Sequence, residues 1–165
     1  MSRPTKMVSF RIDIVILDEI KDMAHRDGLD TGAYIHRLLR LHVSTSDHLS
    51  KLERGRIILT EKLLDAAGSK ARELEAAGKF DERFTLTVIT ALFEDLTFRT
   101  DYEQVIGGDA MSHGLPAKAS LNMNLGWHIK TVVGAEAMTN NGKPRRAQVR
   151  NMPIQSYTLL CKKTC

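Results

Sequence analysis

The stretch MVSFRIDIVILDEIKDMAHRDGLDTGAYIHRLLRLHV, from Met7 to Val43, decides the fold. Apolar and polar residues alternate over Met7–Asp13, which predicts a short β-strand. Apolar residues then recur at helical spacing from Ile16 to Ala24, which predicts an amphipathic helix. A lone strand is not stable in water. We therefore expect this strand to pair with the same strand of a second copy, so that the chain forms a homodimer.

The ends of two helices are marked in the same stretch. Asp13 can accept backbone N–H bonds as the N-cap of the first helix, and Gly28 can end that helix in a left-handed conformation. Asp30 or Thr31 can begin a second helix. The candidate buried positions of the second helix are Ala33, Tyr34, Leu38, Leu39 and Leu41.

The segments SFRID, L-x-x-I-x-x-M-A and G-L-D-T-G-A-Y-I resemble those of the ribbon-helix-helix family of DNA-binding proteins, over roughly the first quarter of the chain. The resemblance implies an intertwined dimer whose paired strands enter the major groove. It also implies the contacts with DNA. The base-reading residues would be Met7, Ser9 and Arg11, and the phosphate contacts would be Lys6 and the backbone near Thr31 and Gly32.

One position departs from the family pattern. Asp30 stands where the family usually has serine or threonine, and a carboxylate beside a phosphate is repulsive. Asp30 is then an N-cap, and Thr31 would donate to the phosphate. The alternative for the whole stretch is a helical hairpin preceded by a basic leader, residues 2–6.

Composition and charge narrow the class of protein. The hydrophobic content is 42%, which allows a packed core, and no apolar run is long enough to span a membrane. The N-terminus lacks the apolar core of a secretory signal, and Cys161 and Cys165 do not resemble a disulfide framework. We expect a cytoplasmic protein without a membrane partner.

The positive charge is concentrated near the C-terminus. The net charge is +4, but residues 111–165 hold eight lysines and arginines against the single acid Glu136, which gives +7 there and −3 elsewhere. Such asymmetry indicates an anion-binding region. The densest basic group, predicted to contact DNA phosphates, is Lys143, Arg145, Arg146 and Arg150.

The pattern predicts an α+β chain in three parts. Residues 1–45 form the ribbon-helix-helix module, residues 46–106 a helical region, and residues 107–165 a small, basic, antiparallel β-rich region. In the middle part, Leu49–Ala77 is predicted to be helical, either as a coiled coil or as an ordinary packed helix. Phe84–Phe98 fits both a strand and a helix, and its length favours a helix.

The last part is predicted to begin with a loop and to continue as strands. Gly107–Pro116 is rich in residues that break helices and strands. Leu121–Lys130 alternates between apolar and polar residues, which predicts a strand, and Ile154–Cys161 is a further strand candidate. Asn141-Gly142 is a strong signal for a tight turn.

These patterns predict a sequence-specific, dimeric protein that binds double-stranded DNA and is not an enzyme, with no cofactor and no metal. Its role would be that of a transcriptional repressor or of an accessory factor on plasmid or mobile DNA, of the relaxosome or partition type. Higher oligomers, and a protein partner bound by the C-terminal half, are compatible with this reading. One alternative is a nuclease-like enzyme with a C-terminal catalytic region, and another is an antitoxin-like protein that binds a partner.

Overall fold

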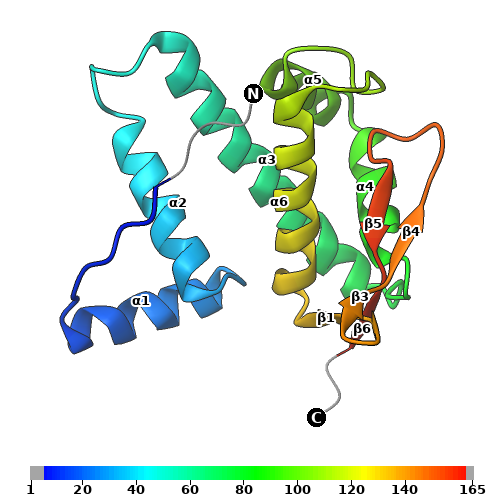
Figure 1. The fold of residues 1–165 in the computed structure, drawn as a ribbon, viewed down its shortest axis with the longest axis horizontal. Helices are drawn as coiled ribbons and strands as arrows, with labels where there is room; N and C mark the ends of the chain where they lie inside the picture. Colours follow the sequence, from blue (N-terminus) through cyan, green and yellow to red (C-terminus); the bar gives the residue numbers. More distant parts are fainter. Residues whose placement is uncertain (1–5, 163–165) are drawn as a thin grey trace.

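The computed structural model describes residues 6–162, so the predictions for residues 1–5 and for Cys165 lie outside the described part. Within residues 6–162 the chain forms six helices, joined by loops and followed by short strands (Figure 1). The helices are α1 (Ile14–Arg26), α2 (Thr31–Val43), α3 (Lys51–Ala76), α4 (Phe84–Phe93), α5 (Leu96–Ile106) and α6 (Pro116–Val132).

The two N-terminal helices begin and end where their capping residues predict. The Asp13 carboxylate accepts the backbone N–H of Val15 at 2.8 Å and caps α1. Gly28 follows α1 with a φ of 66°, a conformation that glycine adopts without strain. The Asp30 carboxylate accepts the backbone N–H of Ala33 at 3.0 Å and caps α2. These three predicted positions are confirmed.

The strand predicted over Met7–Asp13 is not confirmed. Residues 6–13 contain no strand and no helix, and their side chains are mostly exposed. A strand requires a second strand for its backbone N–H and C=O groups, and residues 6–13 pair with no described segment of their own chain. Val8 and Phe10 are therefore exposed to solvent in the single chain.

We call residues 51–162 the body. Its helices α3 to α6 enclose the hydrophobic core. Its largest fully buried side chains are Tyr102, Phe84, Leu63, Ile89, Leu125, Ile129, Leu160 and Val88. The long helix α3 packs against α6, α5, α4 and α2. Leu49–Ala77 is helical as predicted, over Lys51–Ala76, and packs as an ordinary helix within the chain, while a coiled coil between two copies stays a prediction.

Helix α4 confirms the helical reading of the segment that begins at Phe84. Phe84, Val88 and Ile89 are buried on one face, as a helical period requires. The chain turns after Phe93 and continues as α5, which the Asp95 carboxylate caps by accepting the N–H of Thr97 at 2.8 Å.

Helix α6 corrects the sequence prediction for Leu121–Lys130, which is not a strand. Its buried apolar residues lie four apart: Leu121, Leu125 and Ile129. Met123 and Trp127, which alternate with them, are 68% and 40% exposed. A strand would have placed all five on one face. The alternation was misleading because residues four positions apart lie on the same face in a strand and also in a helix.

The C-terminal part is less rich in strands than predicted, because α6 occupies its first half. Three short antiparallel pairs remain: β1 (Ala135–Ala137) with β6 (Leu160–Lys162), β2 (Thr139–Asn140) with β3 (Lys143–Pro144), and β4 (Arg146–Gln148) with β5 (Ser156–Thr158). Asn141 and Gly142 join β2 to β3 with φ values of 50° and 75°, as a tight hairpin turn requires. The predicted turn is confirmed, and so is the strand character of the segment around Tyr157.

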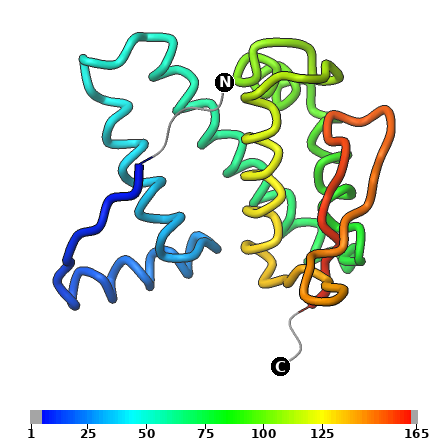
Figure 2. The backbone as a smooth tube through the Cα atoms, viewed as in Figure 1, coloured from blue at the N-terminus to red at the C-terminus, as the bar shows by residue number. Residues whose placement is uncertain are grey.

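The arrangement is therefore mixed α and β, with α1 and α2 at one end of the long axis and the strands at the other (Figures 1 and 2). We call residues 6–43 the N-terminal lobe. None of the helices formed by residues 6–162 has the length and apolar composition needed to cross a membrane.

Candidate nucleic-acid interface

The segment before α1 presents the three predicted base-reading side chains to solvent. Met7 is 91% exposed, and Ser9 and Arg11 are also exposed. Arg11 makes no ion pair with any residue of the described chain, so its guanidinium is available to an external acceptor. Lys6 lies in the same extended segment and is exposed as well. The structure thus brings these four predicted contacts together on one stretch of accessible backbone.

The start of α2 offers two backbone donors. The N–H groups of Thr31 and Gly32 make no hydrogen bond to another described residue, while the next two N–H groups bond to the side chain and the carbonyl of Asp30. Free N–H groups and the helix dipole favour an anion at this position. The Asp30 carboxylate acts as the N-cap, and its negative charge opposes the attraction of a phosphate.

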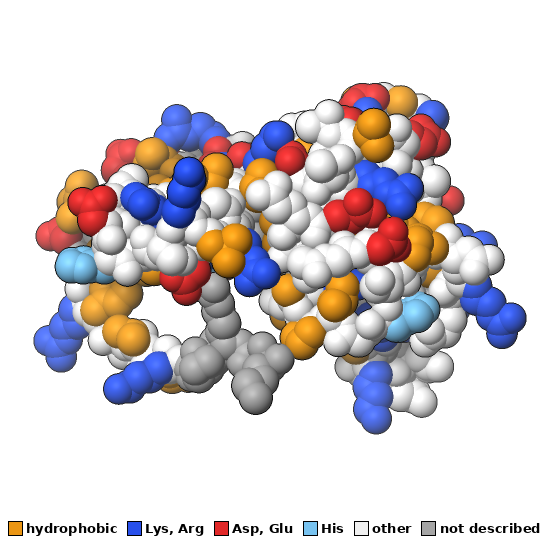
Figure 3. Space-filling view, turned by 90° about the horizontal axis from the view of Figure 1, so that it is seen from above, with side chains coloured by type: hydrophobic (Ala, Val, Ile, Leu, Met, Phe, Trp, Pro, Cys, Tyr) orange, Lys and Arg blue, Asp and Glu red, His pale blue; other side chains and the backbone are white. Residues whose placement is uncertain are grey.

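The N-terminal lobe buries little of its own apolar surface. In residues 6–43 the buried hydrophobic side chains are Ala24 and Tyr34. Eleven large hydrophobic residues are exposed: Met7, Val8, Phe10, Ile14, Val15, Ile16, Met23, Leu38, Leu39, Leu41 and Val43. We call this set the apolar face. Seen from above, hydrophobic side chains lie open on the surface of this lobe (Figure 3).

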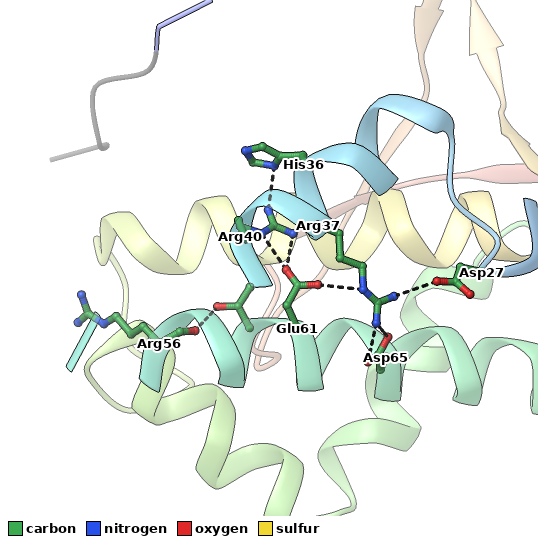
Figure 4. Close-up of polar contacts among 8 residues, drawn as sticks. Asp27, His36, Arg37, Arg40, Arg56, Glu61 and Asp65 are labelled. Atoms are coloured by element: carbon green, nitrogen blue, oxygen red, sulfur yellow. Dashed lines mark hydrogen bonds and ion pairs between the residues drawn. The ribbon is translucent and has the colours of Figure 1, made fainter. Parts of the chain in front are cut away.

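A polar cluster joins the N-terminal lobe to the body. Arg40 of α2 donates through Nε to Oε1 of the buried Glu61 on α3, at 2.8 Å, and a second guanidinium nitrogen also pairs with that oxygen. Arg37, one helical turn earlier, pairs with Asp65 at 2.8 Å and reaches the other Glu61 oxygen at 3.5 Å. Both arginines extend from α2 towards α3, and His36 contacts Arg40 at 3.0 Å (Figure 4).

The turn between α1 and α2 makes a second contact with the body. A Cβ atom at Gly28 would lie 2.5 Å from a methyl group of Val132 on α6, so only glycine fits this approach. Arg72 of α3 donates to the backbone carbonyl of Asp27 at 3.1 Å. The lobe is therefore held through the inner side of α2 and through this turn, and its apolar face remains uncovered.

A buried histidine lies where these contacts meet. Burial lowers the pKa of His128 to about 4. The nearby Asp65 and Asp27 oppose this shift, whereas Arg37 and Arg72 reinforce it. The imidazole is consequently neutral at physiological pH.

Close packing keeps this histidine in place. A Cβ atom at Gly68 of α3 would lie 2.7 Å from Nε2 of His128, so α3 and α6 approach each other closely at this point. The sequence did not identify this position as important, because a glycine within a helical pattern reads first as a weak point of the helix.

The predicted C-terminal phosphate contacts lie far from the base-reading segment. Lys143, Arg145, Arg146 and Arg150 are all exposed, around and after the hairpin turn. They lie at the opposite end of the long axis from residues 6–11 (Figure 1). The predicted DNA contacts therefore form two separate surfaces in one chain.

His113, His128 and Tyr102 carry side chains capable of acid–base or nucleophilic chemistry, but they do not form one site. His113 lies in the loop before α6 and lines a surface hollow, whereas His128 is buried on the opposite part of α6. Tyr102 is fully buried and donates to Oδ1 of Asn122 at 2.7 Å, and burial raises its pKa to about 12. Among residues 6–162, no group of three histidine, cysteine, aspartate or glutamate side chains is placed to hold a metal ion.

Comparison with protein-family models, with curated proteins and with solved structures found no match to this chain. Function is therefore inferred from the residues and from their arrangement.

Proposed function

We propose that the chain is a homodimeric, sequence-specific DNA-binding protein of the ribbon-helix-helix type. The two copies pair through residues 6–13 and the apolar face, and Arg11, Ser9 and Met7 contact base edges in the major groove. Its role is that of a repressor, or of an accessory factor on plasmid or mobile DNA. Both roles use the same contacts.

The observation that carries the proposal is the apolar face of the N-terminal lobe. Eleven exposed large hydrophobic residues lie within 38 residues of chain, and contiguous exposed apolar surface marks sites of protein–protein interaction. Association with a second copy would bury these side chains, and each fully buried one contributes about 1.5–3 kcal/mol. A symmetric dimer buries the same patch on both copies.

The extended segment fits this arrangement. Residues 6–13 have unpaired backbone groups and run directly into α1 without a linker. Pairing with the same segment of a second copy would satisfy those groups and form a two-stranded ribbon, which fits the major groove of B-DNA. Arg11 would lie on the outer side of this ribbon, where a guanidinium can donate two hydrogen bonds to guanine.

The C-terminal basic residues are proposed as a separate surface that contacts phosphates. They supply affinity without sequence preference, because phosphates carry no direct sequence information. Their distance from residues 6–11 means that both surfaces engage one duplex only when that duplex extends along the length of the molecule.

The test is selection of bound duplexes from random and plasmid-derived fragments by the full chain, repeated with Arg11→Ala. We expect the unaltered chain to enrich a defined motif. The Arg11→Ala chain should bind that motif about 1–3 kcal/mol more weakly, with relaxed preference at one base.

The matched control is Arg83→Ala, which removes an arginine whose side chain is 65% exposed on the body. We expect this variant to keep both the motif and its affinity. An unaltered chain that enriches no motif, or an Arg11→Ala chain that behaves like Arg83→Ala, would contradict the proposal.

A further inference from the structure

A surface hollow of about 700 Å³ lies between α6, the loop before it and the C-terminal strands. We call it the α6 hollow. Its floor consists of buried core residues, including Ile89, Ile154, Tyr157 and Leu160. Pockets of roughly 300–1,000 Å³ with a mostly apolar lining and a few polar groups are typical of sites for small organic molecules.

All charged side chains that line the α6 hollow are basic. They are Lys118, Lys130 and Arg146, and none of the described residues lining it is an aspartate or a glutamate. Lys130 is half-buried and makes no hydrogen bond or ion pair with a described residue. Among residues 6–162, the only side-chain bond of Arg146 is its donation to the Ser156 hydroxyl at 2.8 Å. Two cations that pair with no acid of the described residues thus adjoin an apolar floor.

The rim of the α6 hollow is held by polar contacts. Lys118 is a buried residue, 6% exposed. Its ammonium group donates to the carbonyl oxygens of Ala110 and Ser112, at 2.6 and 2.7 Å. It uses two of its three N–H groups in this way. His113 contacts the Gln155 amide and so links the loop before α6 to the loop before β5. The hollow is therefore formed before any ligand enters.

The exposed aromatic ring of α6 completes the site. Trp127 lines the hollow and is 40% exposed, and Met123 lies one turn earlier on the same side. An indole with an open face and a flexible thioether can accommodate a planar or aliphatic group. The combination favours a ligand with an apolar body and a negatively charged group.

We propose that the α6 hollow binds a small amphipathic organic anion. Its carboxylate, sulfonate or phosphate group pairs with Lys130 and Arg146, and its aromatic or aliphatic body covers the floor beside Trp127. This site is distinct from the base-reading segment at the other end of the molecule, and the inference does not depend on the proposed DNA binding.

The test uses the full chain and the fluorescent anion 8-anilinonaphthalene-1-sulfonate. Trp127 is the single tryptophan of the chain and lines the hollow, so energy transfer from tryptophan reports bound probe, and the variants below show whether the probe lies in the hollow. We expect saturable transfer that decanoate, a second amphipathic anion, displaces. Arg146→Gln and Lys130→Gln should each weaken the binding about tenfold, since each removes one charged hydrogen bond.

Arg145→Gln is the matched control, because Arg145 is adjacent to Arg146 in the chain but does not line the hollow. It should leave transfer and probe affinity unchanged. Gly126→Met tests the space rather than the charge. A Cβ atom at Gly126 meets only a Thr85 methyl group, at 3.9 Å, so the helix accepts the change, and the longer side chain should fill the hollow and weaken binding.

Three results would overturn the proposal. The first is transfer and probe affinity that Gly126→Met leaves unchanged, which places the probe outside the hollow. The second is equal binding by the Arg146→Gln, Lys130→Gln and Arg145→Gln chains, provided that circular dichroism shows all three folded. The third is displacement of the probe by a short DNA duplex but not by decanoate, which identifies the hollow as a nucleic-acid phosphate contact.

Discussion

The N-terminal lobe and the body differ in how far their apolar side chains are buried. The body encloses a continuous core that runs from Leu63 to Leu160 and is supplied by four helices and the strands. The lobe buries Ala24 and Tyr34 and leaves an apolar face open. Because burial of apolar surface is the main favourable term in folding, the body can be stable as a monomer. The lobe depends on its attachment to the body and on a partner.

The largest expected effect comes from removing a core side chain of the body. Leu125→Ala should lower the free energy of unfolding by about 2–5 kcal/mol, because Leu125 is fully buried and its loss leaves a cavity. This loss should be the same at low and at high protein concentration, and urea unfolding at two concentrations measures it.

The matched change in the lobe is Leu39→Ala, at a position that is 53% exposed in the single chain. Its effect should depend on protein concentration, because the side chain is buried only when two copies associate. An equal, concentration-independent loss in Leu39→Ala and Leu125→Ala would show that the two regions do not differ as described.

The next effect concerns the histidine at the junction of the two regions. The folded-state pKa of His128 is about 4, below its usual value of 6.5. As the pH falls, the unfolded chain therefore takes up the proton first. The stabilisation is fully present above pH 6.5 and is lost between pH 6.5 and about 4, and it amounts to at most about 3 kcal/mol.

As the pH is lowered through this window, the unfolding midpoint should therefore fall more steeply for the unaltered chain than for His128→Gln. Carboxylates also contribute to acid unfolding, but they are present in both chains, so the difference between the slopes isolates the histidine. Parallel slopes would mean that His128 is protonated equally easily in the folded and unfolded chains.

A smaller effect is expected at the polar cluster between α2 and α3. Glu61→Gln removes the buried carboxylate that Arg37 and Arg40 share. Breaking a fully buried pair costs about 3–5 kcal/mol, and because both arginines are partly exposed we expect about 2 kcal/mol here. Asp65→Asn, at a side chain that is 53% exposed, should cost about 0.5 kcal/mol or less.

Thermal unfolding of the two variants separates a specific attachment from general charge loss. Equal midpoints for Glu61→Gln and Asp65→Asn would mean that the buried carboxylate has no special part in holding the lobe to the body.

Local signals were sufficient where local chemistry determines the structure. The caps Asp13 and Asp30 were predictable because a short carboxylate side chain satisfies backbone N–H groups within three residues of it. The Asn141-Gly142 turn was predictable because few residue pairs adopt two consecutive positive φ values. In each case the interacting groups are neighbours in the sequence.

The remaining features depend on contacts between distant segments. Leu121, Leu125 and Ile129 fit two periods, and only packing of α6 against α3 decides between them. The pairing of Arg40 with Glu61 joins residues 21 positions apart, and many other arginines and glutamates in the sequence could have paired. The α6 hollow was not predictable either, because residues from α4, α6 and the strands line it.

The central claim, that the N-terminal lobe is one half of a dimer, is tested most directly by sedimentation equilibrium of the full chain. The comparison includes Phe10→Glu, on the apolar face, and Leu96→Glu, at a similarly exposed leucine of the body. We predict twice the 18.5 kDa chain mass for the unaltered and Leu96→Glu chains, and the single-chain mass for Phe10→Glu. A single-chain mass for the unaltered protein, or a dimer that Phe10→Glu leaves intact, would contradict the account.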